Sequence, residues 1–211
     1  MIHIYGDSHA LFSFKNIKLN CKDHHQSAIT MFRIGRDNII INFNENDINS
    51  NNDLIVLCYG EIDSRCHVKR QIDNGVNEDD VIDDLVNKYY LTVISNIKKN
   101  YCKIMIVGVI PPTRKTDYET INGRILHEFP FIGSDEDRVR YTGKINKKLK
   151  ELAELYNYIY FNPYSYYTRD DGTLKYELSD NLVHLGDNAE FLEKFYEVYN
   201  SKVLNGRQKV V

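Results

Sequence analysis

Short runs of consecutive apolar residues alternate along this chain with longer segments that have helical periodicity. The apolar runs are IHIY at 2–5, DLIVLCYG at 53–60, CKIMIVGVIPP at 102–112 and YIYFN at 158–162. An uninterrupted apolar run is typical of a strand that is buried on both faces, as in a parallel sheet. The alternation therefore predicts β-α-β units, in which helices cover both faces of one mostly parallel sheet.

The intervening segments repeat apolar residues at steps of about four, which favours helices over residues 78–99, 141–156 and 187–203. Asn77 can cap the first of these helices, and the acidic residues 78–80 suit the positive end of its dipole. With 211 residues, of which 42% are hydrophobic, the chain can bury a sizeable core. We expect one α/β domain over residues 1–211, with three layers in the order α/β/α.

Composition excludes several classes of protein. The net charge is −3 and the basic residues are dispersed, so no basic surface for nucleic acid is expected. No apolar run approaches the roughly 18 residues of a membrane helix, and no charged leader precedes an apolar stretch. None of the four cysteines forms a C-x-x-C pair, which favours a reduced, cytoplasmic protein. Without a G-x-G-x-x-G or Walker A sequence, no nucleotide cofactor is expected.

The stretch YGDSHA at 5–10 places Ser8 directly after the first predicted strand. SDNLVHLGDN at 179–188 places Asp180 and His184 before the last predicted helix, and both segments should meet at the carboxyl edge of a parallel sheet. A nucleophilic serine needs a base, and the base needs a partner that fixes its tautomer. Ser8, His184 and Asp180 are therefore candidate catalytic residues; the alternatives are a turn serine and a histidine that caps or packs against the last helix.

These two blocks, GDSHA and an Asp-then-His pair before a C-terminal helix, resemble those of the SGNH (GDSL-like) hydrolase superfamily. The resemblance implies a flavodoxin-like sheet, a nucleophile from the first block, and a base and carboxylate from the last. It implies an esterase, lipase, thioesterase or deacetylase, or an acyltransferase to glycans, and no cofactor.

Two positions depart from the family pattern. The family's last block is Asp-x-x-His, but Asn181 stands three residues before His184, so either Asp180 or Asn181 could orient the imidazole. The family's Gly-x-Asn-Asp block reads GEID at 60–63, with Ile62 in place of the asparagine that donates to the oxyanion. Losing one such donor typically costs about a hundredfold to a thousandfold in rate. The donors left are the N–H of Ser8 and, in the FRIG block that resembles the second family block, Gly35.

Other polar residues have two possible roles. Glu61, Asp63 and Arg65, together with Asp7 next to the serine, either bind polar substrate groups such as sugar hydroxyls or brace the serine loop. CKDHH at 21–25 contains residue types that bind metals, but no second cluster matches it, so no metal site is predicted. His9 is given no role.

The segment between the third predicted strand and the next helix, at about 111–134, is long for such a connection. It contains Tyr118, Arg124, His127 and Phe129 and is either a substrate lid or a surface insertion.

The sequence as a whole predicts a serine-dependent hydrolase of an acyl ester, with an O-acetylated carbohydrate as the expected substrate. The alternatives are a glycan O-acyltransferase of the same fold and a non-catalytic glycan-binding or assembly protein that has lost its full oxyanion hole.

Overall fold

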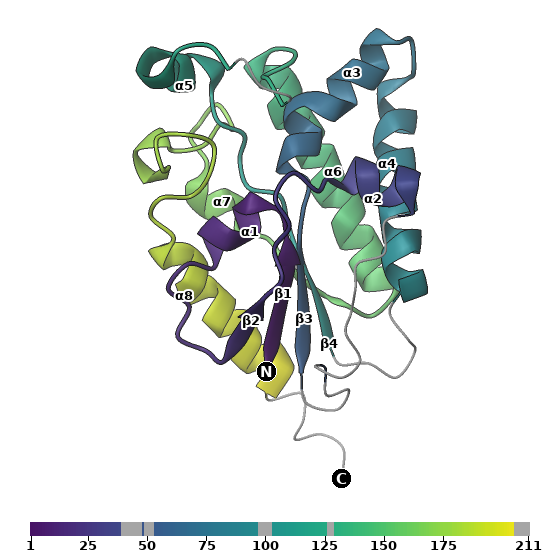
Figure 1. Cartoon of the computed structure of the whole chain (residues 1–211), viewed down its shortest axis with the longest axis vertical. Helices are drawn as coiled ribbons and strands as arrows, with labels where there is room; N and C mark the ends of the chain where they lie inside the picture. The colour runs from purple at the N-terminus through teal and green to yellow at the C-terminus, as the bar shows by residue number, and fades with distance from the viewer. Residues whose placement is uncertain (39–47, 49–52, 97–102, 126–128, 205–211) are drawn as a thin grey trace.

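The computed structural model describes residues 1–38, 48, 53–96, 103–125 and 129–204. The described residues form one parallel sheet of five strands in the order β2-β1-β3-β4-β5 (Figure 1). The strands are β1 (Ile2–Gly6), β2 (Cys21–Asp23), β3 (Leu54–Cys58), β4 (Lys103–Val107) and β5 (Ile159–Phe161). Because every pair is parallel, the carboxyl ends of all five strands lie along the same edge of the sheet.

The helices connect these strands and cover both faces of the sheet. They are α1 (Ser8–Ser13), α2 (Met31–Asp37), α3 (Val68–Asp73), α4 (Glu78–Asn96), α5 (Lys115–Asn122), α6 (Asp135–Leu155), α7 (Tyr164–Tyr167) and α8 (Ala189–Val198). Short π-helical turns lie at η1 (Asp63–His67) and η3 (Tyr199–Leu204), and a 3₁₀ turn lies at η2 (Tyr176–Leu178). In Figure 1, α1 and α8 lie on one side of the sheet and α2, α4 and α6 on the other.

Alternate residues of the central strands serve two separate cores, which explains why these strands are apolar without interruption. In β3, Ile55 and Leu57 pack with residues of α2, α4 and α6, whereas Leu54 and Val56 pack with residues of α1 and α8. This two-sided burial is what a parallel sheet between helices requires. The predicted three-layer α/β/α fold is confirmed.

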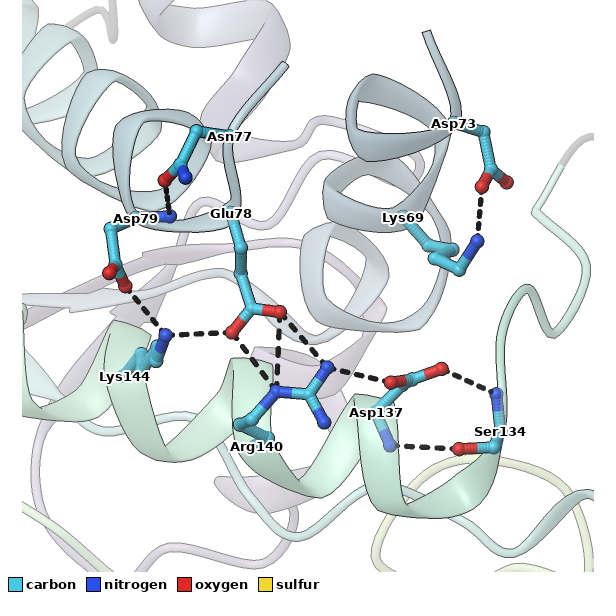
Figure 2. Close-up of polar contacts among 9 residues, drawn as sticks. All are labelled: Lys69, Asp73, Asn77, Glu78, Asp79, Ser134, Asp137, Arg140 and Lys144. Atoms are coloured by element: carbon cyan, nitrogen blue, oxygen red, sulfur yellow. Dashed lines mark hydrogen bonds and ion pairs between the residues drawn. The ribbon is translucent and has the colours of Figure 1, made fainter. Parts of the chain in front are cut away.

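The long helices α4 and α6 lie side by side and are joined by ion pairs near their N-termini (Figure 2). Glu78 accepts hydrogen bonds from the guanidinium of Arg140 and lies 2.7 Å from the ammonium of Lys144. Asn77 caps α4, since its Oδ1 accepts the backbone N–H two residues further on at 2.9 Å. Ser134 caps α6 in a capping box. Both helices therefore start where charge and capping favour them.

The structure also contains elements that the sequence patterns did not predict. The short strand β2 begins at Cys21, inside the CKDHH stretch, whose residue types suggest metal binding and not a strand. The α2 helix begins at Met31, after the N-cap Thr30, and contains the whole FRIG block. Neither has the length on which a periodicity can be judged. Within the described residues, no helix is both long enough and apolar enough to cross a membrane.

Candidate active site

Ser8 is the first residue of α1, and the local sequence explains why a helix starts there. A Cβ at Gly6 would lie 2.3 Å from the Cβ of Ala10 and 2.4 Å from the carbonyl oxygen of Cys58, so only glycine allows this close turn out of β1. Asp7 is the N-cap: its Oδ1 accepts the N–H of His9 at 2.8 Å, and its carbonyl accepts that of Ala10 at 3.1 Å. The N–H of Ser8 has no acceptor among the described residues and is left at the positive end of the helix.

The structure brings the three candidate catalytic residues into one hydrogen-bonded chain. The Nε2 of His184 lies 3.0 Å from the Oγ of Ser8, and its Nδ1 lies 2.8 Å from the Oδ2 of Asp180. The side chains of His184 and Asp180 are each 13% exposed, so the imidazole remains open to a ligand on one side. This is the arrangement of nucleophile, base and orienting carboxylate that acyl transfer requires.

Asp180, and not Asn181, contacts the imidazole, because the loop bulges by one residue at Asn181. The backbone of Asn181 is left-handed, with φ of 64°, and its carbonyl accepts hydrogen bonds from the Tyr176 hydroxyl and the Asn122 amide, both at 2.6 Å. The Oδ1 of Asp180 accepts the N–H groups of Leu182 and His184. These bonds direct the other carboxylate oxygen at the ring.

The environment of this chain keeps His184 in its basic form. Burial lowers the pKa of His184 below its usual value and outweighs the hydrogen bond to Asp180, which acts in the opposite direction. Burial alone would raise the pKa of Asp180, but the hydrogen bond from His184 and its charge make the net shift downward. At neutral pH the imidazole is therefore unprotonated and the carboxylate is ionised, as a general base and its partner require.

A buried charged cluster of His9, Glu61 and Arg65 lies behind the serine. The Nε2 of His9 is 2.8 Å from one oxygen of Glu61, and the Nε of Arg65 is 3.0 Å from the other. The ring of His9 also contacts that of His184, with centroids 4.6 Å apart. Burial would raise the pKa of Glu61, but Arg65 and His9 lower it to about 2. Burial would lower the pKa of His9, and Glu61 reverses this to a net rise.

Asp7 and Asp63 brace loops and do not face a ligand, which corrects one of the two roles that the sequence allowed them. Asp63 has no exposed surface, and its two oxygens accept the N–H groups of Met31 and Phe32 at 2.9 and 3.0 Å. It therefore ties η1 to the first turn of α2. Glu61 and Asp7 are 3% and 1% exposed, so neither presents a carboxylate to a sugar hydroxyl. Of the four residues, Arg65 alone lines the cavity beside Ser8.

Gly35 does not lie at the site, so its prediction as an oxyanion donor is wrong. It lies inside α2, where a Cβ would come within 2.7 Å of the Cβ of Lys88 and 2.9 Å of the backbone nitrogen of Tyr89. Its small size serves the packing of α2 against α4. The residue of this region that lines the cavity with Ser8 is Ala28, whose φ is 63°. No sequence signal points to it, because alanine seldom adopts a left-handed backbone.

A cavity of about 260 Å³ opens beside Ser8 and His184. Its apolar lining consists of Ala28, Ile62, Ile125, Phe129, Leu182 and Val183. Ile62, which replaces the family's asparagine, packs here against Cys66 and Phe129. The long 111–134 segment contributes Tyr118, Ile125 and Phe129, so it forms part of the wall as a lid would; His127 lies outside the described residues.

The CKDHH stretch contains β2 and makes contacts within the protein. His24 lies 3.1 Å from the Nδ1 of His3, and His25 pairs with Asp23 at 2.9 Å. Across the part of the chain that the structure describes, no group of three or more His, Cys, Asp or Glu residues could hold a metal ion.

The chain is similar in structure to several solved proteins, lipases among them. A candidate platelet activating factor from Streptococcus pneumoniae superposes with a TM-score of 0.63 at 14% identity, over 94% of this chain and 81% of the other. A GDSL-like lipase from Bacteroides thetaiotaomicron gives 0.51 at 13% identity, over 100% and 88% of the two chains. An extracellular lipase from Streptomyces rimosus gives 0.53 at 12% identity, over 93% and 98%.

The chain therefore shares its fold with these lipase structures, which agrees with the fold expected from the GDSHA and Asp-then-His blocks. At these identities the likeness is one of fold. No family model matches the sequence. No curated protein matches it either.

Proposed function

We propose that this protein is a serine-dependent acyl-ester hydrolase. The observation that carries the proposal is the hydrogen-bonded chain from Ser8 through His184 to Asp180, at 3.0 and 2.8 Å. A turn serine has no need of a buried, unprotonated imidazole at its hydroxyl. Nor does a helix-capping histidine need a carboxylate on its far nitrogen. The lipase and acylhydrolase structures of the same fold support this reaction class.

In the proposed reaction, His184 takes the proton of Ser8 as the Oγ attacks the ester carbonyl. The tetrahedral intermediate collapses to an acyl-enzyme when the C–O bond to the alcohol breaks, and His184 returns its proton to the leaving oxygen. A water molecule then attacks the acyl group, again with His184 as base, and releases the acid and free Ser8. Asp180 holds the ring in the tautomer whose Nε2 faces Ser8 and stabilises the imidazolium.

The oxyanion would be held mainly by backbone N–H groups. The N–H of Ser8 is free at the start of α1 and points with the helix dipole. Ala28, which lines the same cavity, is our candidate for the second donor. Ile62 leaves the third position apolar, so we expect a slower enzyme than one with an asparagine there.

The cavity favours an ester whose acyl group has an apolar segment. Its wall beside Ser8 is largely aliphatic and aromatic, and three of the four polar residues expected to bind a sugar are committed to internal partners. An O-acetylated carbohydrate therefore has less support than a less polar acyl ester. A glycan O-acyltransferase would use the same acyl-enzyme with a sugar hydroxyl in place of water, and an acceptor sugar would then speed turnover. The apolar Ile62 is the one observation that favours a non-catalytic binding protein.

The test is the intact mass of the protein after incubation with a fluorophosphonate, which phosphonylates activated serines. We expect one adduct on the wild type and none on Ser8→Ala or His184→Ala. Ser201→Ala is the matched control, because Ser201 is an exposed serine in η3, and it should label like the wild type. Absence of an adduct on the folded wild type, or an adduct that survives Ser8→Ala, would refute the proposal and favour the binding protein.

A further inference from the structure

Arg65 presents a charged group to an otherwise apolar cavity. Its side chain is 5% exposed, and the residue lines the cavity that contains Ser8 and His184. The Nη1 donates to the carbonyl of Phe129 at 2.7 Å, and the Nε pairs with Glu61 at 3.0 Å. Among the described residues, the Nη2 has no partner. The Nη2 is accessible to solvent, so it is available to donate to an acceptor on a ligand in the cavity.

Charged side chains surround this edge. Glu61 is the shared partner of two basic side chains, Arg65 and His9, and the buried carboxylate of Asp7 interacts with both of these as well. A second guanidinium, that of Arg138, also lies near the ring of Phe131. Its carbon is 5.0 Å from the ring centroid, and that of Arg65 is 5.8 Å from it. Arg138 is itself paired with Asp135. Of these two guanidinium groups, Arg65 is the one that lines the cavity.

A planar guanidinium that has two of its nitrogens in hydrogen bonds or ion pairs within the protein is well suited to bind a carboxylate with the third. Its Nε and Nη1 bonds hold the plane in place, so little side-chain entropy would be lost when Nη2 binds a ligand. The apolar residues Ile62, Ile125 and Phe129 would contact methylene groups, while Arg65 would contact an anion. Such a cavity is suited to a substrate whose acyl chain is apolar in the middle and carries a negative charge at its far end.

We propose that Arg65 binds a carboxylate at the far end of the substrate's acyl chain, so that the preferred substrates are monoesters of aliphatic dicarboxylic acids. This inference rests on the proposed esterase function and names its substrate class. The acyl carbonyl would lie at Ser8, and the methylene groups would occupy the apolar part of the cavity. An ester without the carboxylate would displace water from this guanidinium edge without supplying an acceptor, which a site of this kind discriminates against.

The first experiment compares two esters of the same shape on the wild type, mono-p-nitrophenyl adipate and p-nitrophenyl 6-methylheptanoate. The latter replaces the carboxylate with an isopropyl group. With Ser8→Ala as the background, we expect kcat/KM to be about tenfold to a hundredfold higher for the adipate. Equal values, or a preference for the neutral ester, would overturn the inference and leave the esterase proposal standing. If neither ester is hydrolysed and no fluorophosphonate adduct forms, the esterase proposal itself fails.

The second experiment assigns the preference to Arg65. In Arg65→Met the ratio of kcat/KM for the adipate to kcat/KM for the neutral ester should fall at least tenfold, mainly through a higher KM for the adipate. Because that variant leaves Glu61 with His9 alone, the double variant Glu61→Gln/Arg65→Met keeps the cluster from gaining a buried negative charge, and thermal unfolding checks that both fold. An equal loss for both esters would show a general role for Arg65 and overturn the inference.

A third measurement does not depend on turnover. Monomethyl adipate should slow fluorophosphonate labelling of Ser8 at concentrations at which methyl 6-methylheptanoate does not. Equal protection by the two methyl esters would contradict carboxylate binding.

Discussion

The Nε2 of His184 lies 3.0 Å from the Oγ of Ser8, although the two residues are 176 positions apart in the chain. The contact depends on two local structures. The helix α1 starts at Ser8 directly after β1, and a bulged loop at residues 180–184 presents the imidazole. Both lie at the carboxyl edge of the sheet, and the predictions below follow from their geometry.

Asp180→Asn should reduce kcat by about a thousandfold or more, whereas Asn181→Gly should change it by no more than a few-fold. The asparagine oxygen can still accept the two backbone N–H groups that Asp180 accepts, at 2.9 and 3.1 Å. Its NH₂ group would then face Nδ1 of His184 and stabilise the wrong tautomer. Glycine is compatible with the left-handed backbone at 181. Steady-state ester hydrolysis measures kcat of both variants. Similar losses of kcat in the two would contradict the assignment of Asp180 as the partner of His184.

The rate of fluorophosphonate labelling should rise with pH along a single titration whose midpoint lies below 6.5. Burial lowers the pKa of His184 from that ordinary value, and only the unprotonated ring can accept the serine proton. The labelling rate should thus be lost as pH falls through the lowered pKa and be level at neutral pH. Labelling rates from pH 4.5 to 8 provide the test; a midpoint above 6.5 would mean that another group controls the reaction.

Ile62→Asn should raise kcat on a neutral ester by about tenfold to a hundredfold, because it supplies an oxyanion donor where the cavity wall is apolar. It should also lower the free energy of unfolding by about 1–3 kcal/mol, since the amide replaces a side chain packed against Cys66 and Phe129. Ile62→Leu is the control, because leucine has the shape of asparagine without its donor. If the two variants have equal kcat, the amide does not reach the oxyanion.

Asp63→Ala should destabilise the protein by about 2–3 kcal/mol through the loss of acceptors for two backbone N–H groups. These are the N–H groups of Met31 and Phe32, at the start of α2. Asp63→Asn, which keeps one carbonyl oxygen, should cost less. Urea unfolding with an unchanged m-value measures the difference. Asp170→Ala, at an exposed position, should stay within about 0.5 kcal/mol of the wild type. If Asp63→Ala has an effect as small as that of Asp170→Ala, Asp63 does not brace the two loops.

Strongly patterned segments could be predicted from the sequence, and unpatterned ones could not. The α4 and α6 helices follow from periodicity and the strands β1, β3, β4 and β5 from continuous apolar runs, and the prediction of Asn77 as a cap is confirmed. The strand β2 (CKD) is no shorter than β5 (IYF), but it is polar, so no apolar run marks it, and the seven-residue α2 is too short to show a period. Gly35 was misplaced because a glycine in a helix interface and a glycine at an oxyanion hole have the same sequence signature.

The sequence by itself determined the three-layer α/β/α fold with its parallel sheet, because the fold depends on the order and the pattern of apolar segments. It also determined that a serine block and an Asp-then-His block meet at the carboxyl edge of that sheet. Only the tertiary structure decided between Asp180 and Asn181, since one left-handed residue redirects the loop. It also decided that Glu61 and Asp63 are internal braces while Arg65 faces the cavity. Burial and pairing depend on what lies opposite each side chain in space, and that information is shared among segments that are far apart in the chain.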